Sequence, residues 1–262
     1  MNKLLHITPE SGTWGTARDQ DVAAVLKSAS IQLWQDCPNT SLNPVIVRYR
    51  SGHPLASFAR DEWARIQVWL SATDTFWCKY AYQMAHEFCH VLAIHSNEDG
   101  NHWHELKHAN HWLEESICET ASLFALRSMA IEWRSAAPYP NWSGYSVNLA
   151  DYAQTIIKEG LGLLGESEPL SGWLTNNEQK LRSNSLAGNT DANRPANKIV
   201  ATRLLPIFEA NPLGWEAVTC LNLVSRDINK PLNQHLIEWR GLCSPNHRKI
   251  ISEIGRELGI AL

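Results

Sequence analysis

Residues 84–94 read Met-Ala-His-Glu-Phe-Cys-His-Val-Leu-Ala-Ile and contain the pattern His-Glu-x-x-His. On a helix, residues four apart lie one turn above each other, so His86 and His90 can present both imidazoles to one metal ion. Glu87 lies about 100° round the helix from His86, within reach of a water on that ion without being a ligand. Two neutral imidazoles suit Zn²⁺, and a catalytic zinc site needs a third protein ligand and one open position for water. The segment therefore predicts an apolar helix that carries two zinc ligands and a general base.

A second match to the pattern spans His104 to His108, in a part of the chain where seven of the eleven histidines fall between residues 86 and 111. The first match lies among apolar side chains, as expected of a helix that holds a metal in a core. The second has Lys107 between its histidines, and a cation next to a ligand opposes the binding of another cation. We predict the metal site at the first match. For the cluster from His95 to His111, a solvated His-rich loop is favoured over a second metal site.

The third ligand is expected on a separate element, and residues 112–119, Trp-Leu-Glu-Glu-Ser-Ile-Cys-Glu, are the obvious source. Glu115 follows His90 by 25 residues, which leaves room for a loop and a second helix that returns antiparallel. Glu115 and Glu119 share one helix face, so one can ligate zinc while the other accepts the N–H of a ligating histidine. Cys89 and Cys118 also lie near proposed ligands, and we interpret them as small buried residues.

These two segments together resemble the site motifs of gluzincin metallopeptidases. Residues 114–119 are similar to the Asn-Glu-x-x-x-Asp motif of thermolysin-like enzymes, with Glu in place of both Asn and Asp, and residues 112–116 are similar to the Trp-Leu-Asn-Glu-Gly motif of aminopeptidase N-like enzymes. The resemblance implies that His86, His90 and Glu115 bind zinc, that Glu87 is the general base and that Glu119 supports a ligand. It covers residues 80–126, and no Gly-x-Met-Glu-Asn motif accompanies it, so aminopeptidase specificity is not implied.

The composition is ordinary for a soluble globular protein, with 44% hydrophobic and 19% charged residues among 262. A net charge of −4 argues against a nucleic-acid binder, which would show a basic stripe. No segment approaches eighteen apolar residues and the first residues do not resemble a signal peptide, so no membrane partner is expected. Six cysteines without a Cys-x-x-Cys pair favour free thiols and a cytoplasmic location.

Hydrophobic periodicity predicts a mixed first part and a helical second part. A helix is expected over Arg18–Cys37, and strands over Leu4–Ile7, Val45–Tyr49 and Ala64–Ser71. A helix over Asn110–Arg134 is expected to carry the third ligand. Six further helices are expected, over Val147–Leu164, Trp173–Leu186, Ala196–Ala210, Leu213–Arg226, Leu232–Gly241 and Pro245–Leu258.

These elements predict an α+β, mostly helical, zincin-like fold with a small N-terminal sheet packed on the active-site helix and a helical C-terminal half. We expect two parts, residues 1–96 and residues 97–262. The polar segment from Asn184 to Pro195 is the expected linker or mobile loop. Asp74 or Thr75 is expected to cap the helix that carries His86.

Two further site roles follow from the expected chemistry. Ile66, Val68 and Leu70 are expected on a strand that is either an edge strand, holding an extended peptide by backbone hydrogen bonds, or an internal strand of a small sheet; both interpretations stay open. The oxyanion formed during hydrolysis needs a further hydrogen-bond donor, usually Tyr or His in gluzincins. Tyr145 is the preferred candidate, against the alternative of a core or surface tyrosine.

The sequence therefore predicts a zinc-dependent metallopeptidase that acts on a peptide or protein substrate. Zinc would polarise the scissile carbonyl, and Glu87 would take the proton of the attacking water and pass it to the leaving amine. The alternative is a non-catalytic zinc-binding protein whose helical half is an interaction platform; the intact Glu87 favours the enzyme. A helical scaffold without metal would require the His and Glu spacings to be coincidental.

Overall fold

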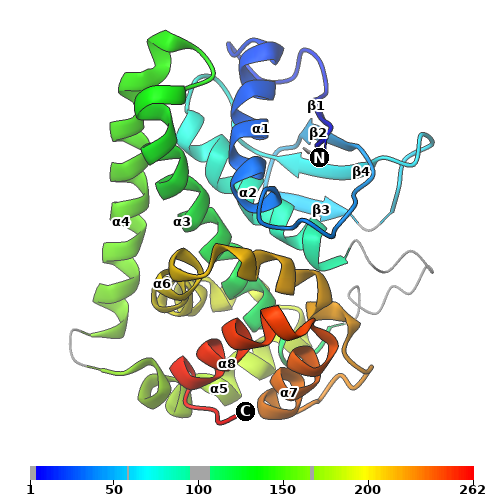
Figure 1. Ribbon diagram of the computed structural model, residues 1–262, viewed down its shortest axis with the longest axis vertical. Helices are drawn as coiled ribbons and strands as arrows, with labels where there is room; N and C mark the ends of the chain where they lie inside the picture. The colour runs from blue at the N-terminus through cyan, green and yellow to red at the C-terminus, as the bar shows by residue number, and fades with distance from the viewer. Residues whose placement is uncertain (1–3, 58, 95–106, 166–167) are drawn as a thin grey trace. The chain divides into compact units, whose positions relative to one another are not determined.

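The chain folds into many helices and one small sheet, as seen in the computed structural model, which describes residues 4–57, 59–94, 107–165 and 168–262 (Figure 1). The strands are β1 (Ile7–Pro9), β2 (Val45–Tyr49), β3 (Leu55–Ser57) and β4 (Ile66–Leu70). The α-helices are α1 (Asp19–Trp34), α2 (Trp77–Ile94), α3 (His111–Ala136), α4 (Ser146–Leu164), α5 (Leu170–Ala187), α6 (Arg194–Ala210), α7 (Leu232–Leu242) and α8 (Arg248–Glu257). The 3₁₀-helices are η2 (Pro140–Tyr145), η3 (Thr190–Asn193), η4 (Pro212–Leu223) and η5 (Pro245–His247). The predicted α+β, mostly helical class is confirmed.

The sheet has the strand order β1-β2-β4-β3, so β4 lies inside it. It pairs in parallel with β2, where Val47 lies opposite Val68, and antiparallel with β3, where Ala56 lies opposite the same valine. Ile66, Val68 and Leu70 are fully buried. Both backbone edges of β4 are therefore used within the sheet. This corrects the edge-strand interpretation of these three residues and supports the internal-strand alternative.

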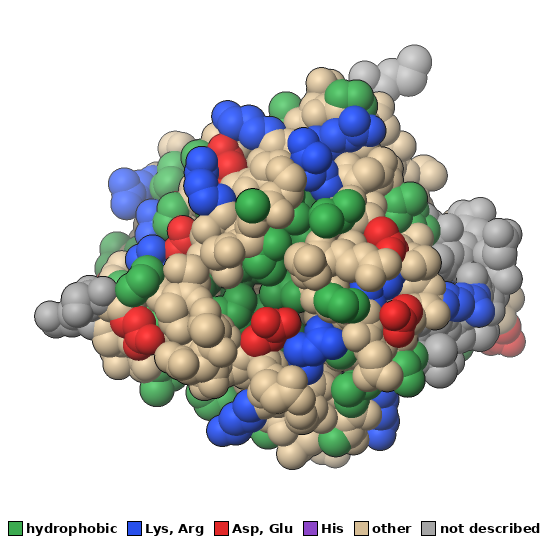
Figure 2. Space-filling model, turned by 90° about the horizontal axis from the view of Figure 1, so that it is seen from below, with side chains coloured by type: hydrophobic (Ala, Val, Ile, Leu, Met, Phe, Trp, Pro, Cys, Tyr) green, Lys and Arg blue, Asp and Glu red, His purple; other side chains and the backbone are tan. Residues whose placement is uncertain are grey.

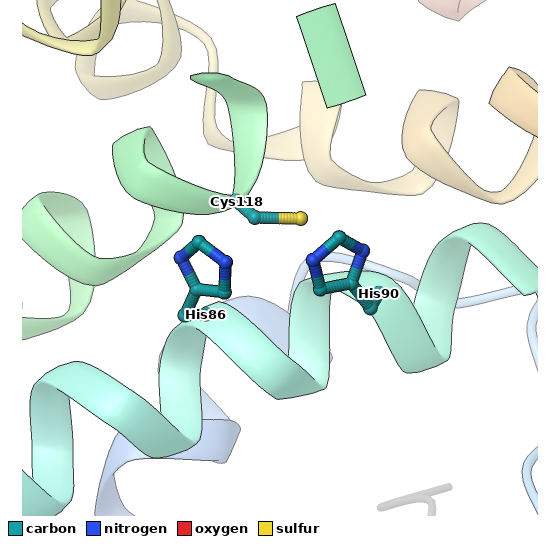
Figure 3. A group of neighbouring side chains, drawn as sticks. All are labelled: His86, His90 and Cys118. Atoms are coloured by element: carbon teal, nitrogen blue, oxygen red, sulfur yellow. The ribbon is translucent and has the colours of Figure 1, made fainter. Parts of the chain in front are cut away.

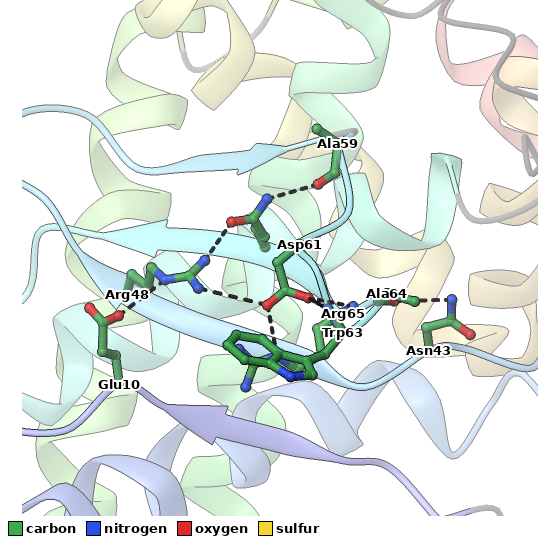
Figure 4. A network of polar contacts seen from close by, with 9 residues as sticks. Glu10, Asn43, Arg48, Ala59, Asp61, Trp63, Ala64 and Arg65 are labelled. Atoms are coloured by element: carbon green, nitrogen blue, oxygen red, sulfur yellow. Dashed lines mark hydrogen bonds and ion pairs between the residues drawn. The ribbon is translucent and has the colours of Figure 1, made fainter.

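The loop between β3 and β4 is organised around the carboxylate of Asp61 (Figure 4). It accepts hydrogen bonds from the backbone N–H groups of Trp63 at 3.1 Å and Arg65 at 2.9 Å, and from Nε of Arg65 at 2.7 Å. Arg48 of β2 lies 3.7 Å from the same carboxylate and 3.2 Å from Glu10. Burial raises the pKa of Asp61, but the hydrogen bonds outweigh it and lower that pKa overall. The network links the loop to the neighbouring strand and so fixes where β4 begins.

Helix α2 is tied to the end of β4 by one glutamine. The side-chain oxygen of Gln83 accepts hydrogen bonds from the backbone N–H groups of Ser71 at 3.0 Å and Ala72 at 3.1 Å, and its amide donates to the Ser71 hydroxyl at 2.9 Å. Asp74, an expected cap of this helix, instead accepts from the backbone and hydroxyl of Thr16. These contacts connect the sheet to the helix that carries His86.

The chain divides into two compact units. Unit 1 consists of Met1–Val91 and Ala121–Gln154, and unit 2 of Leu92–Thr120 and Thr155–Leu262. The first division lies close to the expected one after residue 96, but Ala121–Gln154, expected in the second part, groups with unit 1. Helices α2, α3 and α4 thus each contribute residues to both units.

Each unit has its own core. In unit 1, α1 packs on the C-terminal part of α3, where the buried Trp133 donates a hydrogen bond to the Ser28 hydroxyl at 2.8 Å. In unit 2, the rings of Phe208 and Trp215 stack with centroids 4.0 Å apart. No helix among the described residues is both long and apolar enough to cross a membrane. Basic and acidic side chains are intermingled on the face drawn in Figure 2.

The segment expected to be a linker, Asn184 to Pro195, is instead packed between two helices. Helix α5 runs through its first residues and ends at Gly188, whose φ of 70° is the left-handed conformation that commonly closes a helix. Asn193 is buried, and its amide donates to the carbonyl of Leu181 at 3.0 Å and accepts from Asn184 at 2.8 Å. The polar side chains therefore satisfy buried groups rather than solvate an extended linker.

Candidate metal centre

Helix α2 holds the two histidines of the sequence pattern in the expected arrangement. Its inward face is apolar, with Tyr80, Met84 and Phe88 fully buried at successive turns. His86 and His90 are partly buried, and their ring centroids lie 5.1 Å apart. The helix therefore presents two imidazoles side by side, which is the geometry that one metal ion requires.

Helix α3 adds a third donor, the thiol of Cys118. Among the residues that the structure describes, the ligand atoms of His86, His90 and Cys118 all lie within 4.8 Å of one another. Figure 3 shows the sulfur of Cys118 facing both imidazole rings. Cys118 is fully buried, whereas the two histidines are partly accessible. We call these three residues the His-His-Cys group.

The donors of the His-His-Cys group fit zinc. Zn²⁺ accepts imidazole nitrogen at about 2.0–2.1 Å and thiolate sulfur at about 2.3 Å, in tetrahedral geometry. Donors at those distances would be about 3.3–3.6 Å apart, and the three donor atoms here all lie within 4.8 Å of one another. Ca²⁺ and Mg²⁺ prefer oxygen ligands and fit this set poorly. Three protein donors would leave a fourth tetrahedral position open on a bound zinc ion.

Glu87, the expected general base, lies between the two histidines in the sequence and is buried, with 5% of its surface exposed. A carboxylate next to one ligand and three residues before the other lies on a neighbouring helix face. The structure therefore shows Glu87 buried on the helix that carries both histidines, and its role as general base stays a prediction.

The carboxylates of α3 are distributed differently from the expectation. Glu115, the predicted third ligand, is not a member of the His-His-Cys group within the described residues, and its carboxylate lies 3.6 Å from Nε2 of His111. Glu119 is buried next to Cys118. Cys118 follows Glu115 by three residues and so shares its helix face. That spacing is the signal in the sequence that could have identified Cys118 as a donor and not only as a small buried residue.

Tyr145 is not brought to the two histidines. Its hydroxyl accepts a hydrogen bond from the backbone N–H of Cys78 at 3.4 Å and lies 3.5 Å from the sulfur of the same residue. Cys78 belongs to the first turn of α2, about 12 Å along the helix axis from His86. Burial and the contact with Cys78 raise the pKa of the Tyr145 hydroxyl. These contacts match the alternative of a partly buried structural tyrosine and do not support a catalytic role.

The histidine cluster from His95 to His111 is described only in part, because His95, His102 and His104 lie outside the described residues. The His108 ring is buried and stacks on His235 of α7, with centroids 6.3 Å apart and an interplanar angle of 14°. Burial lowers the pKa of His108 to about 4 and that of His235 to about 3. Both imidazoles are therefore neutral near pH 7.

Comparison of the chain with protein-family models, with curated proteins and with solved structures gives no match. The resemblance to gluzincin motifs stays a prediction made from the residues. A functional proposal therefore depends on the His-His-Cys group and on Glu87.

Proposed function

We propose that this chain is a zinc-dependent hydrolase that cleaves amide bonds in peptides or proteins. The observation that carries the proposal is the convergence of His86, His90 and Cys118 from two helices, with a buried glutamate directly after the first histidine. Two imidazoles and a thiolate would bind zinc and leave a position for water, as in catalytic zinc sites.

Each residue then has a defined task. His86 and His90 would supply neutral nitrogen donors to a bound ion, and Cys118 would supply one negative charge as a thiolate. A zinc ion held there would lower the pKa of a water and polarise the substrate carbonyl. Glu87 would then accept the proton of that water and transfer it to the leaving nitrogen, as expected of a general base and acid on the neighbouring helix face.

The third ligand has two candidates with different support. The sequence pattern favours Glu115, and the geometry favours Cys118, whose sulfur lies within 4.8 Å of both imidazole donor atoms. Either residue would contribute a single negative charge, so the two differ mainly in softness: sulfur favours Zn²⁺ over Mg²⁺ and Ca²⁺. We assign the third position to Cys118 and keep Glu115 as the alternative.

The experiment compares metal content with cleavage. Wild type, His86→Ala and Glu87→Gln are purified without added metal, their zinc is quantified, and each is incubated with a peptide library. Wild type should hold about one zinc per chain. Glu87→Gln should keep the zinc but cleave at least about 100-fold more slowly, because it lacks the general base. His86→Ala should lose both properties.

Two outcomes contradict the proposal in different ways. A folded wild-type protein that contains no zinc and does not bind added zinc would exclude the metal site. Zinc binding without any cleavage that depends on Glu87 would favour the alternative, a non-catalytic zinc-binding protein. Circular dichroism of each variant separates loss of metal from loss of folding.

A further inference from the structure

Two cysteines outside the His-His-Cys group are brought together in unit 2. Cys220 lies in η4, and Cys243 directly follows α7. The sulfur of Cys243 lies 3.7 Å from the carbonyl oxygen of Ala217, which also accepts a hydrogen bond from the indole of Trp239 at 2.8 Å. In a 3₁₀-helix the carbonyl of one residue points to the N–H of the third residue after it, so the Ala217 oxygen lies beside Cys220. The Cys243 thiol is therefore held against the turn of η4 that carries Cys220.

The two thiols differ in exposure and in acidity. Cys243 is buried, with 2% of its surface exposed, whereas Cys220 is partly exposed. The pKa of Cys220 is lowered to about 7, and the largest cause is a hydrogen bond from the Cys243 thiol. Burial raises this pKa, whereas the Thr219 hydroxyl, 3.8 Å from the Cys220 sulfur, lowers it further. The same interaction, together with burial, raises the pKa of Cys243. Cys220 is thus the accessible nucleophile, and Cys243 is its protonated neighbour.

We propose that Cys220 and Cys243 are a reactive thiol pair that is oxidised to an intramolecular disulfide by low-molecular-weight disulfides such as oxidised glutathione. The Cys220 thiolate attacks one sulfur of the oxidant, whose S–S bond breaks and releases one thiolate. Cys243 then gives its proton to solvent and attacks the Cys220 sulfur, releasing the second thiolate. Two electrons pass from the cysteine pair to the oxidant, which leaves as two thiols.

The local structure favours both steps. An attacking thiol is most effective when its pKa is near the ambient pH, as that of Cys220 is. Closing a disulfide requires the two residues to be close already, and the shared contacts at Ala217 hold η4 and the end of α7 together. Thr219 and Arg248 border the pair, the latter donating from Nε to the Cys243 carbonyl at 3.1 Å.

The test treats the intact folded chain with oxidised glutathione, alkylates the remaining thiols and maps the peptides by mass spectrometry. In wild type, the peptides that contain Cys220 and Cys243 should be linked to each other. Cys243→Ser should accumulate one glutathione on Cys220, because no second thiol can displace it. Cys220→Ser should leave Cys243 reduced. Cys37→Ala, which removes a buried thiol in unit 1, is the matched control and should behave as wild type.

If a serine variant fails to fold, the peptide map of oxidised wild type is sufficient to contradict the proposal. The proposal is wrong if Cys220 and Cys243 both stay alkylatable after oxidation, or if Cys220 carries glutathione without linking to Cys243. The alkylation rate of Cys220 in wild type should also rise with pH, with a midpoint near its pKa of about 7. A midpoint near that of an ordinary thiol, about 8.5, would contradict the assigned roles.

Discussion

The chemistry of the candidate metal centre depends on which α3 side chain reaches the imidazoles. Cys118 and Glu115 are three residues apart on one helix face, and a pattern search favours the glutamate because gluzincin motifs contain one there. The structure places the Cys118 thiol with the two histidines, while Glu115 lies 3.6 Å from His111. A single side chain thus determines whether sulfur or oxygen completes the donor set.

Cys118→Ser should weaken zinc binding by at least about 100-fold, because removing a direct ligand costs more than the 10–100-fold typical of supporting residues. Glu115→Gln should weaken it by about 10-fold or less. Competition with a chromophoric chelator measures both affinities. The opposite ranking of the two variants, with both folded, would assign the third position to Glu115.

His108 and His235 should make the fold sensitive to acid. Burial, with the charges of His111 and Lys230, lowers the pKa of His108 to about 4. Burial, with the charges of His108 and Lys230, lowers the pKa of His235 to about 3. Glu114 raises the pKa of both histidines and Glu238 raises that of His235, but these effects are smaller than that of burial. In the unfolded chain both return to about 6.5, so below that pH the unfolded state binds more protons. The free energy of unfolding should fall by up to about 1.4 kcal/mol per pH unit for each histidine, from about pH 6.5 down to the folded pKa values.

Urea unfolding between about pH 7 and pH 5 measures this dependence. His235→Phe keeps an aromatic ring but has no titrating group. It should remove roughly half of the pH dependence of the free energy of unfolding. His6→Gln changes an exposed histidine and serves as the control. An unchanged pH dependence in a folded His235→Phe variant would contradict the assignment.

At the scale of elements, close approach between helices determines where glycine is needed. Helix α4 carries Gly160 and Gly162, and only the first faces a neighbour. A Cβ on Gly160 would clash with Oγ1 of Thr202 and lie 2.8 Å from the carbonyl oxygen of Lys198, both on α6. No atom lies within 4 Å of a Cβ on Gly162.

Gly160→Ala should therefore destabilise the chain by about 1–3 kcal/mol through overpacking against α6. Gly162→Ala, two residues further along the same helix, should stabilise it by up to about 1 kcal/mol, because alanine favours the helix. Urea unfolding of the two variants gives the comparison. Equal effects at both positions would show that α4 and α6 do not pack as described.

At the scale of the whole molecule, the chain forms two compact units, and α2 and α3 take part in both. The donors of the His-His-Cys group come from these two helices, and Cys118 follows His90 by 28 residues in the sequence. A metal bound to the folded chain and not to the unfolded chain stabilises the folded state by mass action.

Chelation should therefore lower the thermal midpoint of zinc-loaded wild type. At a free zinc concentration about 1,000 times the dissociation constant, the loss corresponds to about 4 kcal/mol. Scanning calorimetry with and without chelator measures the change. His86→Ala should show no such change, and Glu87→Gln should show the full change, because Glu87 is not a ligand. Equal responses of wild type and His86→Ala would contradict metal binding at this group.

Local patterns in the sequence determined most of the elements. The β-branched residues of Val45–Tyr49 predict β2, and the pattern after Asn110 predicts α3, which runs from His111 to Ala136. The spacing of His86 and His90 predicts two imidazoles on one helix face, and they lie there. Such features depend on residues within a few turns of each other, so the sequence contains them directly.

Long-range contacts decided the rest. β4 is internal because β3, only three residues long and not predicted from the sequence, pairs with its second edge. Cys118 joins the histidines, and Tyr145 instead contacts Cys78, because of how separate elements pack and not because of any local spacing. Side-chain direction across elements depends on the packing of the whole chain, and no short pattern encodes it.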